Sequence, residues 1–97
     1  MIRHIVFFTA KRPEDRETIR AGLELLKDIP HSLRLEVAVN LATDPIPGPS
    51  PDVVVYGEFA DEDQLAAYKA HPLYQQSIAR VRPLRELRVA ADFEASA

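Results

Sequence analysis

The side chain best suited to chemistry is His4, which lies in the apolar stretch IRHIVFFT at residues 2–9. The pKa of an imidazole is near neutrality, so His4 could act as a general base or as a ligand donor in a pocket between a sheet and its helices. The alternative is a core histidine whose ring nitrogens are bonded to a carbonyl or hydroxyl group. The sequence alone leaves both interpretations open.

A second group of polar side chains lies in the segment YKAHPLY at residues 68–74. Tyr68 and Tyr74 have a pKa of about 10, so they are poor bases at neutral pH but can donate hydrogen bonds to an oxyanion. His71 precedes a proline, and this order predicts a helix break at which the imidazole either bonds the local backbone or reaches a ligand. His31 follows another proline in a predicted loop, where we expect it to be exposed.

The residue types that are missing exclude several kinds of site. The chain of 97 residues has no cysteine, so it forms neither disulfides nor thiolate metal sites. Its three histidines are scattered, without a pair at positions i and i+4, and we therefore predict no metal site. The three glycines stand apart from one another and form no phosphate-binding loop, so we expect no cofactor.

The charge balance argues against nucleic acid as a partner. Fifteen Asp and Glu residues outnumber twelve Lys and Arg residues, for a net charge of −3, whereas a nucleic-acid-binding surface is usually basic. One basic cluster is interrupted by apolar and acidic residues, as is typical of a helix end that runs into a strand: Arg80, Arg82, Arg85 and Arg88. No apolar run approaches the ~18 residues that a membrane span needs. Since no secretory signal is recognisable, we expect a cytoplasmic protein.

Hydrophobic periodicity predicts the elements that must position these residues. Alternating apolar residues predict strands at residues 2–9, 33–41, 52–60 and 86–93. Helical spacing predicts helices at residues 13–29 and 61–82, the second interrupted at His71. The order β-α-β-β-α-β is that of the ferredoxin-like α+β fold, a four-stranded antiparallel sheet with the helices on one face. We expect residues 1–97 to form a single domain.

The predicted sheet is apolar on both faces. In the first strand, Val6 and Phe8 point to one side, and Ile5 and Phe7 point to the other. A strand that is apolar on both sides needs cover on both sides. A chain this short also builds a thin core, which a partner chain can extend. We therefore predict a homodimer, packed sheet against sheet.

The connection between the second and third strands, TDPIPGPSP at residues 43–51, holds four of the eight prolines. Proline removes backbone donors and fixes φ, so this segment is predicted to be an irregular loop. The loop could close over a pocket or contact a partner. The plainer interpretation is a tolerated insertion at the surface.

Three segments, IRHIVFF, LAAYKAHPLYQ and LRVAADFE, resemble the stress-responsive dimeric A/B barrel family, also called Dabb. The resemblance covers nearly the whole chain in order and spacing, and its most specific part is the Tyr-x-x-His-Pro stretch from Tyr68 to Pro72. It implies a ferredoxin-like fold whose sheets pair across a two-fold axis into a dimeric α+β barrel. It implies no single reaction, because the wider superfamily includes cofactor-free monooxygenases, a lactone isomerase and haem enzymes.

The family includes a plant polyketide cyclase, whose motif Tyr-x-x-His-Pro-x-His implies site residues in this chain. Tyr68 and His71 match the motif, whereas Tyr74 stands where the final histidine, the base of the cyclase, should be. His4 matches a histidine that lines the cyclase pocket, and Val53 stands in place of a further pocket histidine. The resemblance therefore implies His4 and Tyr68 as catalytic candidates. It implies a ligand-binding role for His71, Tyr74 and Val53, without the mechanism of the cyclase.

The sequence leaves two functions open. One is a dimeric binding or stress-response protein without catalysis, which the missing histidine at Tyr74 favours. The other is a cofactor-independent enzyme, such as a cyclase, isomerase or monooxygenase, that acts on a small aromatic or polyketide-like substrate. In that enzyme His4 would be the acid or base, and Tyr68 or Tyr74 the hydrogen-bond donor. A structural dimerisation module is a third alternative.

Overall fold

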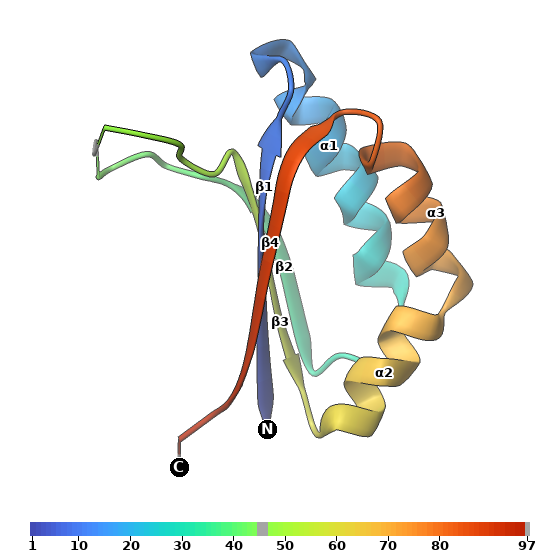
Figure 1. Ribbon diagram of the computed structural model, residues 1–97. Helices are drawn as coiled ribbons and strands as arrows, with labels where there is room; N and C mark the ends of the chain where they lie inside the picture. Colours follow the sequence, from blue (N-terminus) through green and yellow to red (C-terminus); the bar gives the residue numbers. More distant parts are fainter. Residues whose placement is uncertain (45–46, 97) are drawn as a thin grey trace.

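The computed structural model describes residues 1–44 and 47–96 and has the predicted element order (Figure 1). The strands are β1 (Ile2–Ala10), β2 (Arg34–Val39), β3 (Val53–Phe59) and β4 (Arg85–Glu94). The helices are α1 (Arg16–Leu23), α2 (Glu62–Ala70) and α3 (Pro72–Val81), with short 3-10 turns at Pro13–Asp15 and Glu24–Asp28. No helix within the described residues is long and apolar enough to cross a membrane.

The four strands form one antiparallel sheet in the order β2-β3-β1-β4. The helices lie against one face of this sheet, and the other face is open (Figure 1). The predicted ferredoxin-like α+β fold is thereby confirmed. Because β4 lies beside β1, residues from the two ends of the chain become neighbours, with His4 opposite Asp92 and Phe8 opposite Arg88.

The core lies between the sheet and the helices, and the two-residue period of each strand decides which side chains enter it. Its buried apolar members come from β1, β3 and the helices, and include Ile2, Val6, Phe8, Ile19, Leu23, Val53, Val55, Phe59, Leu65 and Val81. Gly22 allows α1 and α3 to approach closely, since a Cβ atom there would lie 3.0 Å from Cγ2 of Val81. The Ser77 hydroxyl of α3 donates to the Gly22 carbonyl at 3.0 Å and joins the two helices.

Some element boundaries differ from the prediction. Pairing of β2 with β3 runs only from Arg34 to Val39, so the predicted strand residues Leu33 and Leu41 lie outside it and are exposed. The first predicted helix is a short α-helix between two 3-10 turns. The predicted break at His71 is confirmed: its backbone is extended, with φ −68° and ψ 142°, and α3 begins at the next residue, a proline that suits a first helical turn.

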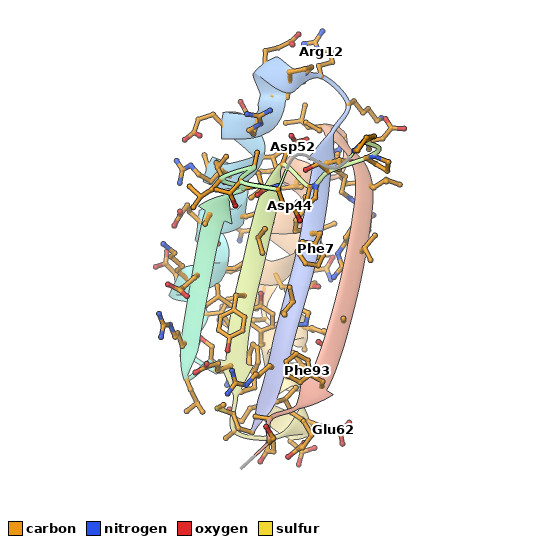
Figure 2. All side chains as sticks on the ribbon, turned by 90° about the vertical axis from the view of Figure 1, so that its left-hand side faces the viewer. Phe7, Arg12, Asp44, Asp52, Glu62 and Phe93 are labelled. Carbon is orange, nitrogen blue, oxygen red and sulfur yellow. The ribbon has the colours of Figure 1, made fainter. Side chains whose placement is uncertain are left out.

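The open face of the sheet is apolar along β1 and β4 (Figure 2). Phe7, Leu87, Val89 and Phe93 lie on this face with 39–56% of their surface exposed. The register places Phe7 directly beside Val89, so these side chains form a continuous patch. A contiguous apolar patch on the surface of a small protein commonly marks an interaction site.

The loop between β2 and β3 leaves the sheet on its open side, away from the helices (Figure 1). Pro45 and Ile46, within the predicted loop 43–51, lie outside the described residues. Pro49 and Pro51 border a groove on the open face together with Phe7. The described part of the loop therefore does not cover the space between the sheet and the helices.

Candidate functional site

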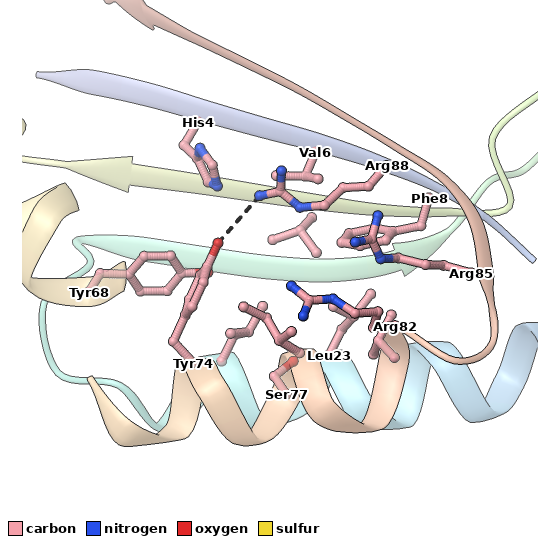
Figure 3. A pocket seen from close by; sticks show the side chains of 14 residues that line it. His4, Val6, Phe8, Leu23, Tyr68, Tyr74, Ser77, Arg82, Arg85 and Arg88 are labelled. Atoms are coloured by element: carbon pink, nitrogen blue, oxygen red, sulfur yellow. Dashed lines mark hydrogen bonds between the residues drawn. The ribbon is translucent and has the colours of Figure 1, made fainter. Parts of the chain in front are cut away.

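A cavity of about 270 Å³ lies between the sheet and α3, beside His4 (Figure 3). Its apolar wall is continuous with the core and consists of Val6, Phe8, Leu23, Leu26, Val55, Ile78 and Val81. Its polar lining comes from β1, α2, α3 and β4 and from the residue that follows α3. It consists of His4, Tyr68, Tyr74, Ser77, Arg82, Arg85 and Arg88. An apolar enclosure with a few converging polar groups is the usual form of a small-molecule site.

His4 is buried, with 1% of its surface exposed, and its ring is held by Asp92 of the neighbouring strand. Nδ1 of His4 is hydrogen-bonded to Oδ1 of Asp92. An ionised carboxylate can only accept a hydrogen bond, so Nδ1 of His4 carries the proton that is donated to Asp92. In the neutral ring Nε2 then carries a lone pair. Among the described residues, no group forms a hydrogen bond with Nε2, and Figure 3 shows the ring directed into the cavity, toward Tyr74 and Arg88.

The surroundings of His4 favour its neutral form. Burial lowers the pKa of His4 below its usual value of 6.5, although the hydrogen bond and the charge of Asp92 act in the opposite direction. The positive charges of Lys69 and Arg88 lower it further. Nζ of Lys69 lies 4.0 Å from Oδ2 of Asp92, so this carboxylate is shared between the two basic groups. At neutral pH the imidazole of His4 is therefore in its neutral form.

Tyr68 is buried among aromatic rings at the α2 side of the cavity. Its ring centroid lies 4.9 Å from that of Phe59, 5.4 Å from that of Tyr74 and 6.2 Å from that of His4. Burial raises the pKa of Tyr68 well above its usual value, and the neighbouring Tyr74 raises it further. The phenol therefore stays neutral and can act as a hydrogen-bond donor but not as a base.

Tyr74 links the histidine end of the cavity to a group of arginines. Its hydroxyl accepts a hydrogen bond from a terminal nitrogen of Arg88 at 3.3 Å, which leaves the tyrosine proton free to bond a ligand (Figure 3). Arg82 and Arg85 line the cavity beyond this pair.

The structure brings together three of the five candidate residues. His4, Tyr68 and Tyr74 line the same cavity, as the resemblance implies. Val53 lies in the core with none of its surface exposed and does not line the cavity; its neighbour on the same face of β3, Val55, does.

His71 is also absent from the cavity lining. Its Nδ1 accepts a hydrogen bond from the Leu73 backbone N–H at 3.1 Å, so the side chain caps α3. This is the local backbone role that the His-Pro order allowed. His31 is half-buried rather than exposed: its ring stands 6.4 Å from that of His71, and its Nδ1 lies 3.3 Å from the side-chain oxygen of Gln64.

Sequence reasoning missed Asp92 and the arginines of the cavity. Asp92 lies in one of the segments that resemble the family, but its contact with His4 depends on the register between β1 and β4. Arg88 precedes Asp92 by four residues, so the two side chains share a face of β4. The alternation of the strand was therefore the signal that could have placed Arg88 beside the cavity. The apolar residues of β4 occupy the opposite, open face, so the polar side of this strand faces the helices.

The chain matches the family model described as the stress responsive A/B barrel domain, Dabb, over residues 2–95. Among solved structures, a dimeric ferredoxin-like protein of unknown function from Thermobifida fusca is similar, with 28% identity, a TM-score of 0.80 and coverage of 97% of this chain and 90% of that one. A Dabb family protein from Mesorhizobium loti has 23% identity, a TM-score of 0.78 and coverage of 99% and 97%. A putative antibiotic biosynthesis monooxygenase from Nitrosomonas europaea has 18% identity, a TM-score of 0.79 and coverage of 98% of both chains. A comparison with the curated proteins finds no match.

Proposed function

The chain belongs to the stress responsive A/B barrel domain family, and from this premise we propose that it is an acid–base enzyme for a small molecule bound beside His4. One observation carries the proposal: His4 is bonded to Asp92 through Nδ1, while Nε2 faces the cavity without a protein partner among the described residues. A core histidine with a purely structural role would have both ring nitrogens satisfied by the protein.

The proposed reaction is the removal of a proton from a carbon next to a carbonyl group. Nε2 of His4 takes the proton, and the electron pair of the broken C–H bond moves onto the carbonyl oxygen. Asp92 stabilises the imidazolium that forms, and the hydroxyls of Tyr68 and Tyr74 donate hydrogen bonds to the developing oxyanion. Return of the proton to another carbon completes an isomerisation. Attack of the enolate carbon on a second carbonyl of the same molecule forms a ring, and the alkoxide that results takes the proton back from Nε2 of His4.

The proposal assigns the base differently from the related cyclase. Tyr74 stands where the cyclase has its final histidine, and a phenol is a poor base at neutral pH. His4 with Asp92 supplies a base from the other side of the cavity, on the sheet. Tyr74 then serves as a donor, since its hydroxyl is already oriented by Arg88.

We further propose that the protein is a homodimer packed through the open faces of two sheets. The apolar patch of Phe7, Leu87, Val89 and Phe93 supports this arrangement, and the relative from Thermobifida fusca is described as dimeric. The loop before β3, which leaves the sheet on its open side, would then contact the partner. The cavity lies on the opposite face of the sheet, so each protomer would keep its own.

A cytoplasmic location is also part of the proposal. It is supported by the lack of disulfides in a chain without cysteine, because disulfides are rare in cytoplasmic proteins. Cell fractionation of the producing organism, followed by immunoblotting, tests it, and recovery of the protein outside the cytoplasmic fraction would refute it.

The enzymatic proposal is tested by hydrogen–deuterium exchange. Aromatic ketones, with and without a carboxylate, are incubated with the protein in deuterated water, and loss of the α-proton signal is followed by NMR. We expect the protein to accelerate exchange of at least one compound, and His4→Gln to slow this exchange by roughly 100- to 10,000-fold. Asp92→Asn serves as a second variant, because Asp92 is more exposed than His4 and its substitution disturbs the core less.

A matched control for these variants is His31→Gln, since His31 does not line the cavity. Melting curves show whether each variant is folded. Exchange that continues at the wild-type rate in folded His4→Gln and Asp92→Asn would refute the assignment of the base. Binding of a compound without any exchange would favour the non-catalytic binding protein instead, the alternative that Tyr74 supports by replacing a histidine.

A further inference from the structure

The proton-transfer step gives no role to the arginines that line the cavity. Arg82 lies at the C-terminal end of α3, and Arg85 and Arg88 lie in β4, and all three line the cavity. Figure 3 shows their side chains entering the same space: Arg88 ends beside Tyr74 and His4, and Arg82 and Arg85 lie farther from Tyr68. A cavity needs no such group of cations to hold an aromatic or aliphatic molecule.

Within the described residues, these three guanidinium groups have no carboxylate partner, unlike four of the six other arginines of the chain. Each of four arginines lies within 3.4 Å of a carboxylate oxygen: Arg12, Arg16, Arg20 and Arg34. In the part of the chain that the structure describes, no carboxylate lies within 4.0 Å of Arg82, Arg85 or Arg88. Asp92, on the same face of β4, is bonded to His4 and lies near Lys69. A chain of net charge −3 thus places three arginines without carboxylate partners along the lining of one cavity.

We propose that the molecule bound in this cavity carries an anionic oxygen group, a carboxylate or a phosphate, which Arg82, Arg85 and Arg88 hold while the reacting carbon lies at His4. The inference rests on the proposed function in taking this cavity as the ligand site, and it adds the class of substrate. The substrate is then a small organic acid with a carbonyl group rather than a neutral ketone.

The chemistry of arginine supports this class of ligand. A guanidinium group is planar and always charged, and its donors match the two oxygens of a carboxylate or phosphate. Arg85 is half-buried, and in its partly apolar surroundings such bonds are stronger than in water, because the effective dielectric constant is lower. Three guanidinium groups from two elements also fix the direction of the ligand, which a single surface arginine would not do.

The size of the cavity restricts the rest of the molecule. Its volume of about 270 Å³ is near the lower end of the range for ligand sites, so a single ring or a short chain fits beside the anionic group. The apolar residues Val6, Phe8 and Leu23 line the cavity and would contact this part. Tyr74 connects the two ends, since its hydroxyl accepts from Arg88 and can donate to a carbonyl oxygen near His4.

The test compares three probes that differ in charge. Phenylacetate carries a carboxylate, phenyl phosphate a phosphate, and phenylacetamide is the neutral analogue of the first. Their binding to the wild-type protein is measured by NMR titration of backbone amides, with the signals of β4 and α3 reporting on the cavity. We expect one of the anions to bind about tenfold or more tightly than the amide, and added salt to weaken this preference. The tighter of the two anions identifies the group.

The matching variants are Arg82→Gln, Arg85→Gln and Arg88→Gln, made singly and together. The combined variant is expected to lose the preference for the anion, whereas Arg80→Gln, from the same helix end but outside the cavity lining, keeps it. Arg85→Lys retains the charge but loses the planar guanidinium group with its paired donors. We therefore expect this variant to bind the anion more weakly than the wild type. A preference that survives in the combined variant would overturn the proposal, as would failure of every probe to bind.

The outcomes separate this inference from the proposed function. If the amide and the anions bind equally and His4-dependent exchange is observed, the anion site is refuted and the acid–base function stands. If an anion binds through the arginines but exchange does not depend on His4, the anion site stands and the acid–base function is refuted.

Discussion

His4 and Asp92 are 88 residues apart in the sequence and face each other across β1 and β4, joined by a hydrogen bond from Nδ1 to the carboxylate. The pairing of two strands is sufficient to form this dyad, because both side chains belong to one face of one sheet. The sheet is the most rigid part of a fold of this kind, so the ring is held without help from loops. Its remaining nitrogen lies beside a cavity of ligand size.

Asp92→Asn tests whether the carboxylate acts on His4. An asparagine keeps the size of the side chain but loses the negative charge that stabilises an imidazolium. Its amide can also favour the other tautomer of His4, with the proton on Nε2. We expect the His4-dependent exchange rate to fall by roughly 100-fold or more, with little change in ligand affinity. The control is Glu94→Gln, a carboxylate on the same face of β4 that is paired with the chain's amino terminus. Equal losses in both variants would contradict a specific role for Asp92.

The lowered pKa of His4 predicts how the rate depends on pH. A base is active when it is unprotonated, so the exchange rate should be constant above pH 6.5 and should fall only at a pH below this value. The pH profile of the exchange rate, measured with a ligand that does not itself titrate in this range, checks the prediction. A profile that falls at or above pH 6.5 would contradict a buried, neutral His4.

The same pKa makes a separate prediction about stability. Between the lowered pKa and 6.5, the unfolded chain binds a proton at His4 that the native protein does not bind. The free energy of unfolding should therefore be highest above pH 6.5 and should decrease as the pH falls through this window. Urea unfolding at a series of pH values measures the slope, and His4→Gln should reduce it. His31→Gln, which leaves His4 in place, should leave the slope due to His4 unchanged.

The strands and helices follow from periodicity, but the contacts of the site do not. Val6 and Phe8 predict the face to which His4 points, because residues two apart share a face of a strand. The partner of His4 requires the register between the first and last strands, and a slip of one residue would replace Asp92 by a neighbour on the other face. No local pattern specifies that register.

The last strand shows why polarity alone misplaces some residues. Leu87, Val89 and Phe93 form the apolar side of β4, and the apolar side of a strand usually faces its own helices. Here it lies on the open face, and the polar side with Arg88 and Asp92 borders the cavity. Similarly, the resemblance implied Val53 as a pocket residue. Val53 is instead fully buried in the core, and Val55 lines the cavity.

Tyr68→Phe tests the hydrogen-bond donor on α2. The variant keeps the ring and its contacts with Phe59 and Tyr74, so we expect the free energy of unfolding to change by no more than about 1 kcal/mol. The exchange rate should fall by roughly 100-fold, the usual loss when one donor to an oxyanion is removed. Tyr56→Phe, whose hydroxyl bonds Glu58 on the open face, is the matched control. An unchanged rate in Tyr68→Phe would assign the donor role to Tyr74 alone.

Val89→Lys tests the proposed dimer. Val89 lies beside Phe7 in the apolar patch, and burying an unpaired lysine there would cost several kcal/mol. We expect the dimer dissociation constant, measured by analytical ultracentrifugation, to rise by about 100-fold or more. Ala79→Lys, on an exposed position of α3, should leave it unchanged. A wild-type protein that is monomeric at micromolar concentration would refute the dimer.

The central claim is that His4 is a neutral base with its proton on Nδ1 and its Nε2 directed to the ligand. A long-range ¹⁵N–¹H correlation spectrum of the histidine rings at neutral pH measures this directly, with the His4 signals identified by their loss in His4→Gln. The account predicts a protonated Nδ1 and an unprotonated Nε2, and a change in the Nε2 shift when a ligand binds. A proton on Nε2, or a fully protonated ring at neutral pH, would contradict it.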